Sequence, residues 1–241
     1  LDESSRVASH YNQLSEQSRH ERQKSQIFHL RSFNNWCKSV LIFKYVRGGD
    51  AVLDFCCGKG GDLIKYTHSN IKEWYGVDIA EESVEQALQR YNRMDTSFRA
   101  SFYVGDVSKI DLNTQLPQEV QFDASCCQFA LHYSWKNEES ARTFLKNATE
   151  RLKPNGHFVC TTTDGYVLKQ KLMDSPDNTI RNSVMEATFD KKDMAQSDGY
   201  YGIRYVFTLK ERVDSVPEYL VHPKELVLEL LNKWVHLEQK W

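Results

Sequence analysis

The sequence lacks the marks of several common protein classes. Its six cysteines include no Cys-x-x-Cys pair, so we expect no structural zinc site, and the thiols fit a reducing compartment. No signal peptide and no apolar run long enough to cross a bilayer is visible. An excess of positive charge is also missing: the formal net charge is −2, so any contact with nucleic acid must come from a local basic patch.

The bulk composition is that of an ordinary globular protein. The 241 residues are 40% hydrophobic and 27% charged, which suits one large α/β domain with a buried core. Because the sequence begins at Leu1 and not at a methionine, we expect it to be a trimmed fragment.

Composition changes along the chain suggest an N-terminal arm before this domain. Residues 1–31 are polar and basic, so we expect an arm that is either solvated or binds phosphate, with Tyr11, Ile27 and Phe28 packed on something. Residues 32–241 form the single domain. It should open with an amphipathic helix over residues 32–46 whose first residue, a serine, caps it.

Residues 51–62, AVLDFCCGKGGD, carry the strongest local signal. An apolar run of strand-forming residues ends in Asp54, and the chain then passes through Gly58, Gly60 and Gly61 into a helix. Strand, glycine turn and helix make the first unit of an open α/β sheet, in which ligands bind at the carboxyl ends of the strands. Glycines let the backbone approach a ligand closely. The sequence therefore predicts a cofactor site at this turn.

Two cofactors commonly bind at such a turn, a dinucleotide or S-adenosylmethionine (AdoMet). The dinucleotide fingerprint Gly-x-Gly-x-x-Gly fails, because its last position counted from Gly58 is Leu63. Two acids favour AdoMet: Asp54 suits its cationic end, and Asp78, which ends the next apolar run, suits ribose hydroxyls. The alternative is a glycine turn that only connects two elements. It is disfavoured because the sheet geometry aims both acids at one cleft.

Strand and helix patterns alternate as far as residue 161. Five strands alternating with helices imply a parallel, doubly wound α/β sheet. Residues 164–216 break the alternation, and we interpret them as an insertion with short antiparallel strands, followed by a helix at 223–231. The expected later strands are 73–77, 101–104, 122–127 and 157–161, and the expected helices are 62–68, 81–93 and 138–152.

Taken together, these motifs resemble the eukaryotic mRNA cap guanine-N7 methyltransferases over nearly the whole chain. A glycine loop alone would indicate only an AdoMet-binding fold. The Gln-Phe-x-x-His-Tyr and Pro-Glu-Tyr segments are much more specific to this family. The resemblance implies a seven-stranded class I methyltransferase (Rossmann-like) sheet with a cap-binding insertion after the fifth strand. The matching segments are FNNWCK at 33–38, CGKGGD at 57–62, GVDI at 76–79, QFALHY at 128–133 and VPEY at 216–219.

The resemblance, with the residue chemistry, also assigns candidate site residues. Those expected at the AdoMet pocket are Lys38, Asp54, Cys56, Gly58, Asp78, Asp106, Gln128 and Tyr133. Those expected at the capped nucleotide are Asn34, Asn35, Lys59, Lys65, Arg90, Phe129, His132 and Glu218. No metal ligand is expected.

The chemistry of guanine explains these residue types. A carboxylate such as Glu218 can accept hydrogen bonds from both N1–H and the exocyclic amine, whereas adenine would leave the charge unpaired. Phe129 or Tyr133 can stack on the base, which is worth about 1–3 kcal/mol. The basic side chains can neutralise the triphosphate bridge.

The reaction implied by the resemblance moves the methyl group of AdoMet to N7 of the terminal guanosine of a GpppN cap, leaving S-adenosyl-L-homocysteine. It needs no general base, because N7 already carries a lone pair and has no proton to lose. In-line positioning, which can contribute about 7–11 kcal/mol, is then the enzyme's task. We expect Glu218, His132 and Tyr133 to position the substrate and no side chain to take a proton.

Several assignments have a purely structural alternative. Asn34 and Asn35 could satisfy backbone amides at a helix start. Lys65 and Arg90 could be solvated residues on helix surfaces. One departure from the family is Cys56, which replaces the first glycine usual in this loop, adds bulk beside the methionine moiety and weakens cofactor affinity.

Two other functions remain open: a cap- or RNA-binding subunit that keeps the fold without activity, and a class I methyltransferase acting on a small molecule. For the favoured function we expect a nuclear monomer that binds 5′-capped mRNA and no membrane. RNA polymerase II or other capping enzymes are candidate partners.

Overall fold

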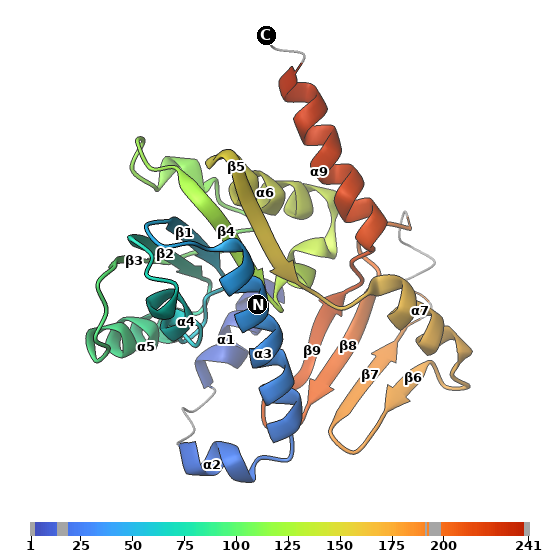
Figure 1. The fold of residues 1–241 in the computed structure, drawn as a ribbon. Coiled ribbons are helices and arrows are strands. Elements are labelled where there is room, and N and C mark those ends of the chain that lie inside the picture. The colour runs from blue at the N-terminus through green and yellow to red at the C-terminus, as the bar shows by residue number, and fades with distance from the viewer. Residues whose placement is uncertain (1–2, 14–18, 191, 193–198, 239–241) are drawn as a thin grey trace.

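The computed structural model describes residues 3–13, 19–190, 192 and 199–238, which form two β-sheets with flanking helices (Figure 1). The first sheet is parallel, with strand order β3-β2-β1-β4-β5, and the second is antiparallel, with order β6-β7-β8-β9. Five parallel strands flanked by helices confirm the predicted α/β class. The strands of the first sheet are β1 (Ala51–Phe55), β2 (Glu73–Asp78), β3 (Arg99–Val104), β4 (Phe122–Gln128) and β5 (Leu152–Thr161).

The strand order places a ligand crevice at the centre of the parallel sheet. β1 pairs in parallel with β2 on one side and with β4 on the other. The chain order reverses between β1 and β4, and in open α/β sheets ligands bind at such a switch point, outside the carboxyl ends of the strands. The glycine turn that follows β1 therefore opens into this crevice.

Helices cover both faces of this sheet and exclude water from it. On one face Ile42 of α3 (Phe28–Tyr45) and Leu63 of α4 (Leu63–His68) pack with Val52 of β1. On the other face Phe144 of α6 (Glu138–Thr149) packs against Phe55. A further helix of this region, α5 (Glu81–Asn92), follows β2. The apolar alternation along β1 thus gives the sheet two separate hydrophobic layers.

The prediction that a helix begins at Ser32 is wrong. α3 begins at Phe28, and the Ser32 hydroxyl donates to the carbonyl of Phe28 inside the helix (2.9 Å). The side chain of Ile27 is 1% exposed, so burial of this residue, not a capping hydroxyl, fixes the start of the helix. The expected boundary between arm and domain consequently falls inside α3.

The N-terminal segment contains two further helices, α1 (Glu3–Gln13) and α2 (Arg19–Lys24). α1 contacts α5 and the last strand of the second sheet, so residues 3–13 are not a solvated arm. The expectation that Tyr11 and Ile27 pack on the domain is confirmed, whereas Phe28 is 38% exposed. Residues 1–2 and 14–18 of the expected arm lie outside the described residues.

The insertion after β5 forms the antiparallel sheet, as predicted, and adds a helix that was not predicted, α7 (Gly165–Asp174). Residues 191 and 193–198 within it lie outside the described residues. The last strand runs past the expected end of the insertion, so it carries the Pro-Glu-Tyr segment back to the first sheet. The strands are β6 (Thr179–Arg181), β7 (Met185–Phe189), β8 (Arg204–Leu209) and β9 (Val213–Tyr219).

Two further differences from the expected pattern concern the parallel sheet. β5 begins five residues early, at Leu152, and a register shift opposite Phe122 and Ala124 accommodates Pro154 and Gly156. In the described residues the sheet has five of the seven strands that the resemblance implies, and α9 (Pro223–Glu238) follows β9 as predicted. None of the described helices is both long and apolar enough to cross a membrane.

Candidate functional site

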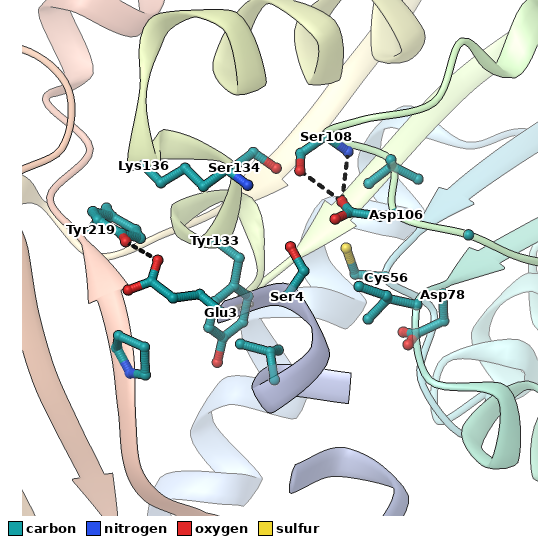
Figure 2. Close-up of a pocket in the computed structure, with 15 residues that line it drawn as sticks. Glu3, Ser4, Cys56, Asp78, Asp106, Ser108, Tyr133, Ser134, Lys136 and Tyr219 are labelled. Atoms are coloured by element: carbon teal, nitrogen blue, oxygen red, sulfur yellow. Dashed lines mark hydrogen bonds between the residues drawn. The ribbon is translucent and has the colours of Figure 1, made fainter. Parts of the chain in front are cut away.

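A pocket that is partly open to solvent lies at the carboxyl ends of the parallel strands (Figure 2). Four of the expected cofactor residues, Cys56, Asp78, Asp106 and Tyr133, line it. The rest of the wall comes from the loops after β2 and β3, from the segment after β4, from α1 and from the end of β9, so both sheets and the N-terminal helix contribute. The structure thus brings together residues that are distant in sequence.

Asp78 at the end of β2 is tied to the glycine turn. Its Oδ2 accepts a hydrogen bond from the Gly58 amide (2.8 Å), and its Oδ1 accepts one from the Ala80 amide (2.9 Å). Gly58 has φ 52, a left-handed conformation that glycine adopts without strain. Burial raises the pKa of Asp78, and the backbone amides oppose this by stabilising the charged form. The carboxylate is therefore held rigidly at the pocket wall, with lone pairs left for a ligand hydroxyl.

Asp106, just after β3, has one carboxylate oxygen that accepts hydrogen bonds and one that accepts none from the described residues. Oδ1 accepts from the amide (3.0 Å) and the hydroxyl (2.6 Å) of Ser108. Oδ2 is buried without a hydrogen-bond partner among the described residues, although Lys109 Nζ lies 3.4 Å away. Burial opposes ionisation, but interactions with Ser108 and Ser4 and the charge of Lys109 together outweigh it and lower the pKa of Asp106. An ionised acceptor that lacks a donor suits an amine or hydroxyl of a ligand.

The contribution of α1 was missed by the sequence reasoning. Figure 2 shows Glu3 and Ser4 facing the pocket, and the Tyr219 hydroxyl donates to Glu3. At the other end of the helix the hydroxyls of Tyr11 and Tyr133 are 2.9 Å apart. The four-residue spacing of Val7 and Tyr11, two apolar positions on one helix face, was the available signal.

A second candidate site lies beside Tyr133 and is built around Glu218 of β9. Glu218 is 5% exposed and accepts a hydrogen bond from the Tyr205 hydroxyl through Oε2 (2.5 Å). Its Oε1 lies 3.5 Å from His132 Nε2. Burial and the neighbouring Glu218 raise the pKa of Tyr205, so this hydroxyl stays protonated and can donate. A buried carboxylate is thus held between an aromatic hydroxyl and an imidazole.

His132 is neutral at physiological pH in this setting. Burial lowers the pKa of His132, and the opposing effect of Glu218 is smaller. Neither ring nitrogen has a hydrogen-bond partner in the described part of the chain. The contact with Glu218 is therefore not an ion pair, and the ring can still exchange a hydrogen bond with a ligand. Because its ring packs edge-on against Tyr133 (centroids 4.3 Å apart), the two candidate sites share a wall.

A network of ionic contacts around Asp62 holds several of the expected basic and amide residues. Asp62 accepts from Lys38 Nζ (2.8 Å) and Lys65 Nζ (2.7 Å), and Lys65 also donates to Asn35 Oδ1 (2.6 Å). Burial opposes the charge of Asp62, but the two lysines outweigh it and lower its pKa. Lys65 is only 4% exposed, so the solvated alternative is wrong for this residue.

Other expected site residues lie outside the lining of the first pocket. Asn34 and Asn35 lie inside α3, so the helix-start alternative is wrong for both. Lys59 lies in the glycine turn, and Arg90 lies in the last turn of α5. Their roles at the capped nucleotide remain predictions.

The turn after β4 carries two more of the expected residues. Gln128 accepts from the Thr161 hydroxyl (3.0 Å), and its amide nitrogen is 3.4 Å from the Val159 carbonyl. Phe129 is 38% exposed and adopts φ 58, which strains a non-glycine residue. Stacking by Phe129 and cofactor binding by Gln128 remain predictions. Among the described residues no group of three or more potential metal ligands occurs.

Asp54 lies behind the glycine turn and not in the lining of the pocket. It is 5% exposed, and burial, reinforced by the charge of Asp62, raises its pKa to about 8. Tyr66 and Trp74 lie beside the carboxyl group. At neutral pH such a group is largely protonated. It therefore offers little negative charge to the cationic end of a cofactor.

Cys56 has φ 53, which explains why a glycine is usual at this position. We expect Cys56→Gly to remove bulk from the pocket and tighten AdoMet binding roughly fivefold, or about 1 kcal/mol. The free energy of unfolding should change by less than about 1 kcal/mol, because relief of strain offsets the flexibility of glycine. Titration calorimetry with AdoMet measures this. The control is Cys57→Ala, whose side chain packs toward the other face of the sheet; equal affinities of wild type and Cys56→Gly would contradict the expectation.

Comparisons with known proteins agree with this geometry. The family model described as mRNA (guanine-N(7))-methyltransferase domain matches residues 1–238. The chain is 41% identical over 227 residues to mRNA cap guanine-N(7) methyltransferase 1 of Arabidopsis thaliana, covering 90% of this chain and 61% of the relative. It is 38% identical over 222 residues to mRNA cap guanine-N(7) methyltransferase of Schizosaccharomyces pombe (strain 972 / ATCC 24843), covering 89% and 62%. The chain thus spans about three fifths of the length of these curated relatives.

A comparison of folds gives the same architecture. The crystal structure of an S-adenosylmethionine-dependent methyltransferase from Clostridium acetobutylicum ATCC 824 superposes with a TM-score of 0.55. The two are 17% identical, and the match covers 82% of this chain and 78% of the other. At this identity the likeness concerns the fold alone.

Proposed function

The chain belongs to the mRNA (guanine-N7) methyltransferase family, and we propose that it methylates N7 of the terminal guanosine of a GpppN cap, with AdoMet as the methyl donor. The observation that carries the proposal is the buried carboxylate of Glu218, which accepts a hydrogen bond from Tyr205 and lies 3.5 Å from His132, beside a pocket lined by Glu3, Asp78 and Asp106. A class I methyltransferase fold is compatible with many substrates, so the substrate argument rests on the residues of this site.

The pocket fits AdoMet by the chemistry of its donor set. Asp78 has lone pairs available for the ribose hydroxyls, and Asp106 Oδ2 lacks a donor that the adenine amine can supply. When bound, AdoMet supplies a methyl group on a positively charged sulfur. Cys56 and Tyr133 line the same pocket, and Ser4 and Val7 of α1 cover it and exclude water.

The Glu218 site fits guanine better than adenine. An ionised carboxylate accepts the two adjacent donors on the edge of guanine, whereas adenine offers an acceptor and a donor and would leave the buried charge unpaired. Tyr205 already donates to Glu218, which keeps the carboxylate oriented when a base enters. Neutral His132 can hydrogen-bond the substrate without placing a positive charge beside N7, which becomes cationic on methylation.

The residues of this chain act by positioning and need move no proton. Guanine N7 is an unprotonated lone pair at neutral pH, so a general base has no task. The Tyr133 ring lies between the two sites and sets the distance between base and cofactor. Correct alignment in such a site contributes about 7–11 kcal/mol to lowering the barrier.

We further propose that the protein acts in the nucleus, as a monomer, on 5′-capped mRNA, with RNA polymerase II or other capping enzymes as candidate partners. A second candidate function is a cap-binding subunit without methyl transfer. Cys56 favours it, because it adds bulk and backbone strain at the cofactor pocket. Asp78 and Asp106 oppose it, since a subunit without transfer has no need of these two carboxylates in a pocket at the carboxyl ends of the parallel strands.

Labelled AdoMet tests the proposal with three substrates: GpppA-capped RNA, ApppA-capped RNA and uncapped triphosphate RNA. We expect label on guanine N7 of the GpppA-capped RNA alone, mapped by nuclease digestion and mass spectrometry. Cap binding without label would support the inactive subunit. Equal labelling of ApppA-capped RNA would show that Glu218 does not select guanine.

A further inference from the structure

The outer face of α3 carries an exposed aromatic stripe that the proposed methyl transfer does not use. We define the α3 stripe as Phe33, Trp36, Val40 and Phe43, whose spacing of three and four residues places them on one side of the helix. Phe33 and Trp36 are 59% and 60% exposed, and their ring centroids are 6.0 Å apart. The buried face of the same helix, at Ile42, fixes α3 to the parallel sheet. The stripe is thus a rigid exposed surface.

The stretch of sequence that contains the α3 stripe carries basic side chains and no acidic ones. No acidic residue occurs between Glu21 and Asp50, a stretch that includes all of α3 and several basic residues. Although the formal net charge of the protein is −2, α3 itself carries no acidic side chain. Lys38 on its inner face is paired with Asp62, whereas Lys44 in its last turn supplies local positive charge. Aromatic faces with basic groups and no acids are the usual surface for single-stranded nucleic acid.

A second pocket lies where α3 ends, at the amino ends of the parallel strands and opposite the cofactor pocket. Its lining includes Lys44, Tyr45, Arg47, Lys153 and His157. The rings of Tyr45 and His157 are 5.2 Å apart, and Lys44 Nζ lies 5.2 Å from the centre of the Tyr45 ring. We call this group the basic end pocket. The basic end pocket combines aromatic rings, which can stack on a base, with cations, which can bind a phosphate.

The two acids of the basic end pocket are already engaged. Asp123 accepts from Lys153 Nζ (2.7 Å) and from the Ala51 amide (2.8 Å), and Asp50 accepts from the Arg47 amide (2.6 Å). The lining holds three lysine or arginine side chains, Lys44, Arg47 and Lys153, against two acids, Asp50 and Asp123, so one positive charge is in excess. This excess positive charge can attract a phosphate.

We propose that the RNA body behind the cap docks along α3, with bases stacked on Phe33 and Trp36 and its phosphates led toward the basic end pocket. This rests on the proposed function, because Asn35, expected at the capped nucleotide, lies with Lys38 on the inner face of α3, where the two contact Lys65 and Asp62. A helix with its side chains is only about 10–12 Å across, so an RNA chain leaving the inner face soon reaches the outer one. From Phe33 to Arg47 the surface is about 21 Å long, which suits a chain of several nucleotides and exceeds a single small ligand.

The test compares a cap dinucleotide with a capped RNA of about 20 nucleotides, a length chosen to exceed the surface along α3. We expect Phe33→Ala/Trp36→Ala to raise KM for the capped RNA by about fivefold or more, the loss of at least one stacked base, and to leave kcat and KM for GpppA unchanged. Leu228→Ala, at an equally exposed apolar position on α9, is the matched control and should change neither substrate.

Direct binding separates this proposal from the methyl transfer. An uncapped 5′-hydroxyl RNA should bind wild type, and Arg47→Gln should lower the slope of log affinity against log salt by about 0.7. This measurement supports or refutes RNA docking even if no cap is methylated.

Three results would overturn the proposal. Equal losses on GpppA and capped RNA would mean that the stripe supports the methyl-transfer site instead. Unchanged KM and unchanged RNA binding would mean that RNA runs elsewhere. A wild-type dimer that becomes monomeric in Phe33→Ala/Trp36→Ala, with RNA binding intact, would identify the stripe as an interface between two copies of this chain.

Discussion

Glu218→Gln should lower kcat/KM for GpppA-capped RNA by roughly 30- to 1,000-fold, or about 2–5 kcal/mol. The amide has nearly the shape of the carboxylate but places an NH₂ donor where guanine also presents donors, so one hydrogen bond is lost and a polar group is left unpaired. The site is desolvated, with Glu218 only 5% exposed, which makes an unpaired group costly.

The measurement is initial-rate methylation with saturating AdoMet, alongside AdoMet titration of the same variant. AdoMet affinity should stay at the wild-type value, because Glu218 does not line the cofactor pocket. Asp214→Asn, an exposed acid on the same strand, is the matched control and should retain full activity. Activity of Glu218→Gln within a factor of two of wild type would remove the guanine-recognition role.

Asp54→Asn should make the protein progressively more stable than wild type as the pH rises from about 4 to about 8. Burial raises the pKa of Asp54 from its model-compound value of 3.8 to about 8, so the folded state holds a proton that the unfolded state releases above pH 3.8. The stabilisation from that proton is complete below pH 3.8 and is lost as pH rises through about 8. Within this window Asp54 lowers the free energy of unfolding of wild type by up to about 1.4 kcal/mol per pH unit, or several kcal/mol in all.

Urea unfolding of both proteins at several pH values between 5 and 8 measures the difference. The difference in the free energy of unfolding between variant and wild type removes the contributions of Asp62 and Asp106, which both proteins share. The lowered pKa values of these two residues give the opposite pH dependence. Asp95→Asn changes an exposed acid and should show a constant difference. A constant difference for Asp54→Asn as well would show that Asp54 is ionised in the folded state.

The parallel sheet could be predicted because its strands are largely apolar runs separated by glycine turns, loops and helical patterns. Asp78 and Asp106 were found in this way, since Asp78 ends the buried strand β2 and Asp106 follows the edge strand β3 after one glycine. Asp54 shows where the rule fails. Side chains alternate along a strand, so Asp54 shares the face of Val52, under α3 and α4, while Leu53 and Phe55 face the other way. A strand-end position alone does not say into which layer a carboxylate points.

The rest of the site depends on contacts that no local pattern encodes. Tyr11 meets Tyr133 across 122 residues, and Glu3 meets Tyr219 across 216. The start of α3 was missed for a related reason, because capping preferences are weaker than the burial of Ile27. The salt-bridge network around Asp62 likewise joins α3 to α4, and only the packed helices bring Lys38 to it.

The position of α1 sets a practical limit on how this chain can be shortened. A fragment cut at the compositional boundary, before residue 32, would retain both sheets yet lose Ser4 and Val7 from the pocket wall and Tyr11 from its contact with Tyr133. It would also cut α3 after its first turn. Such a fragment would fold around a cofactor site open on one side, so the minimal unit for binding studies must reach back to Glu3.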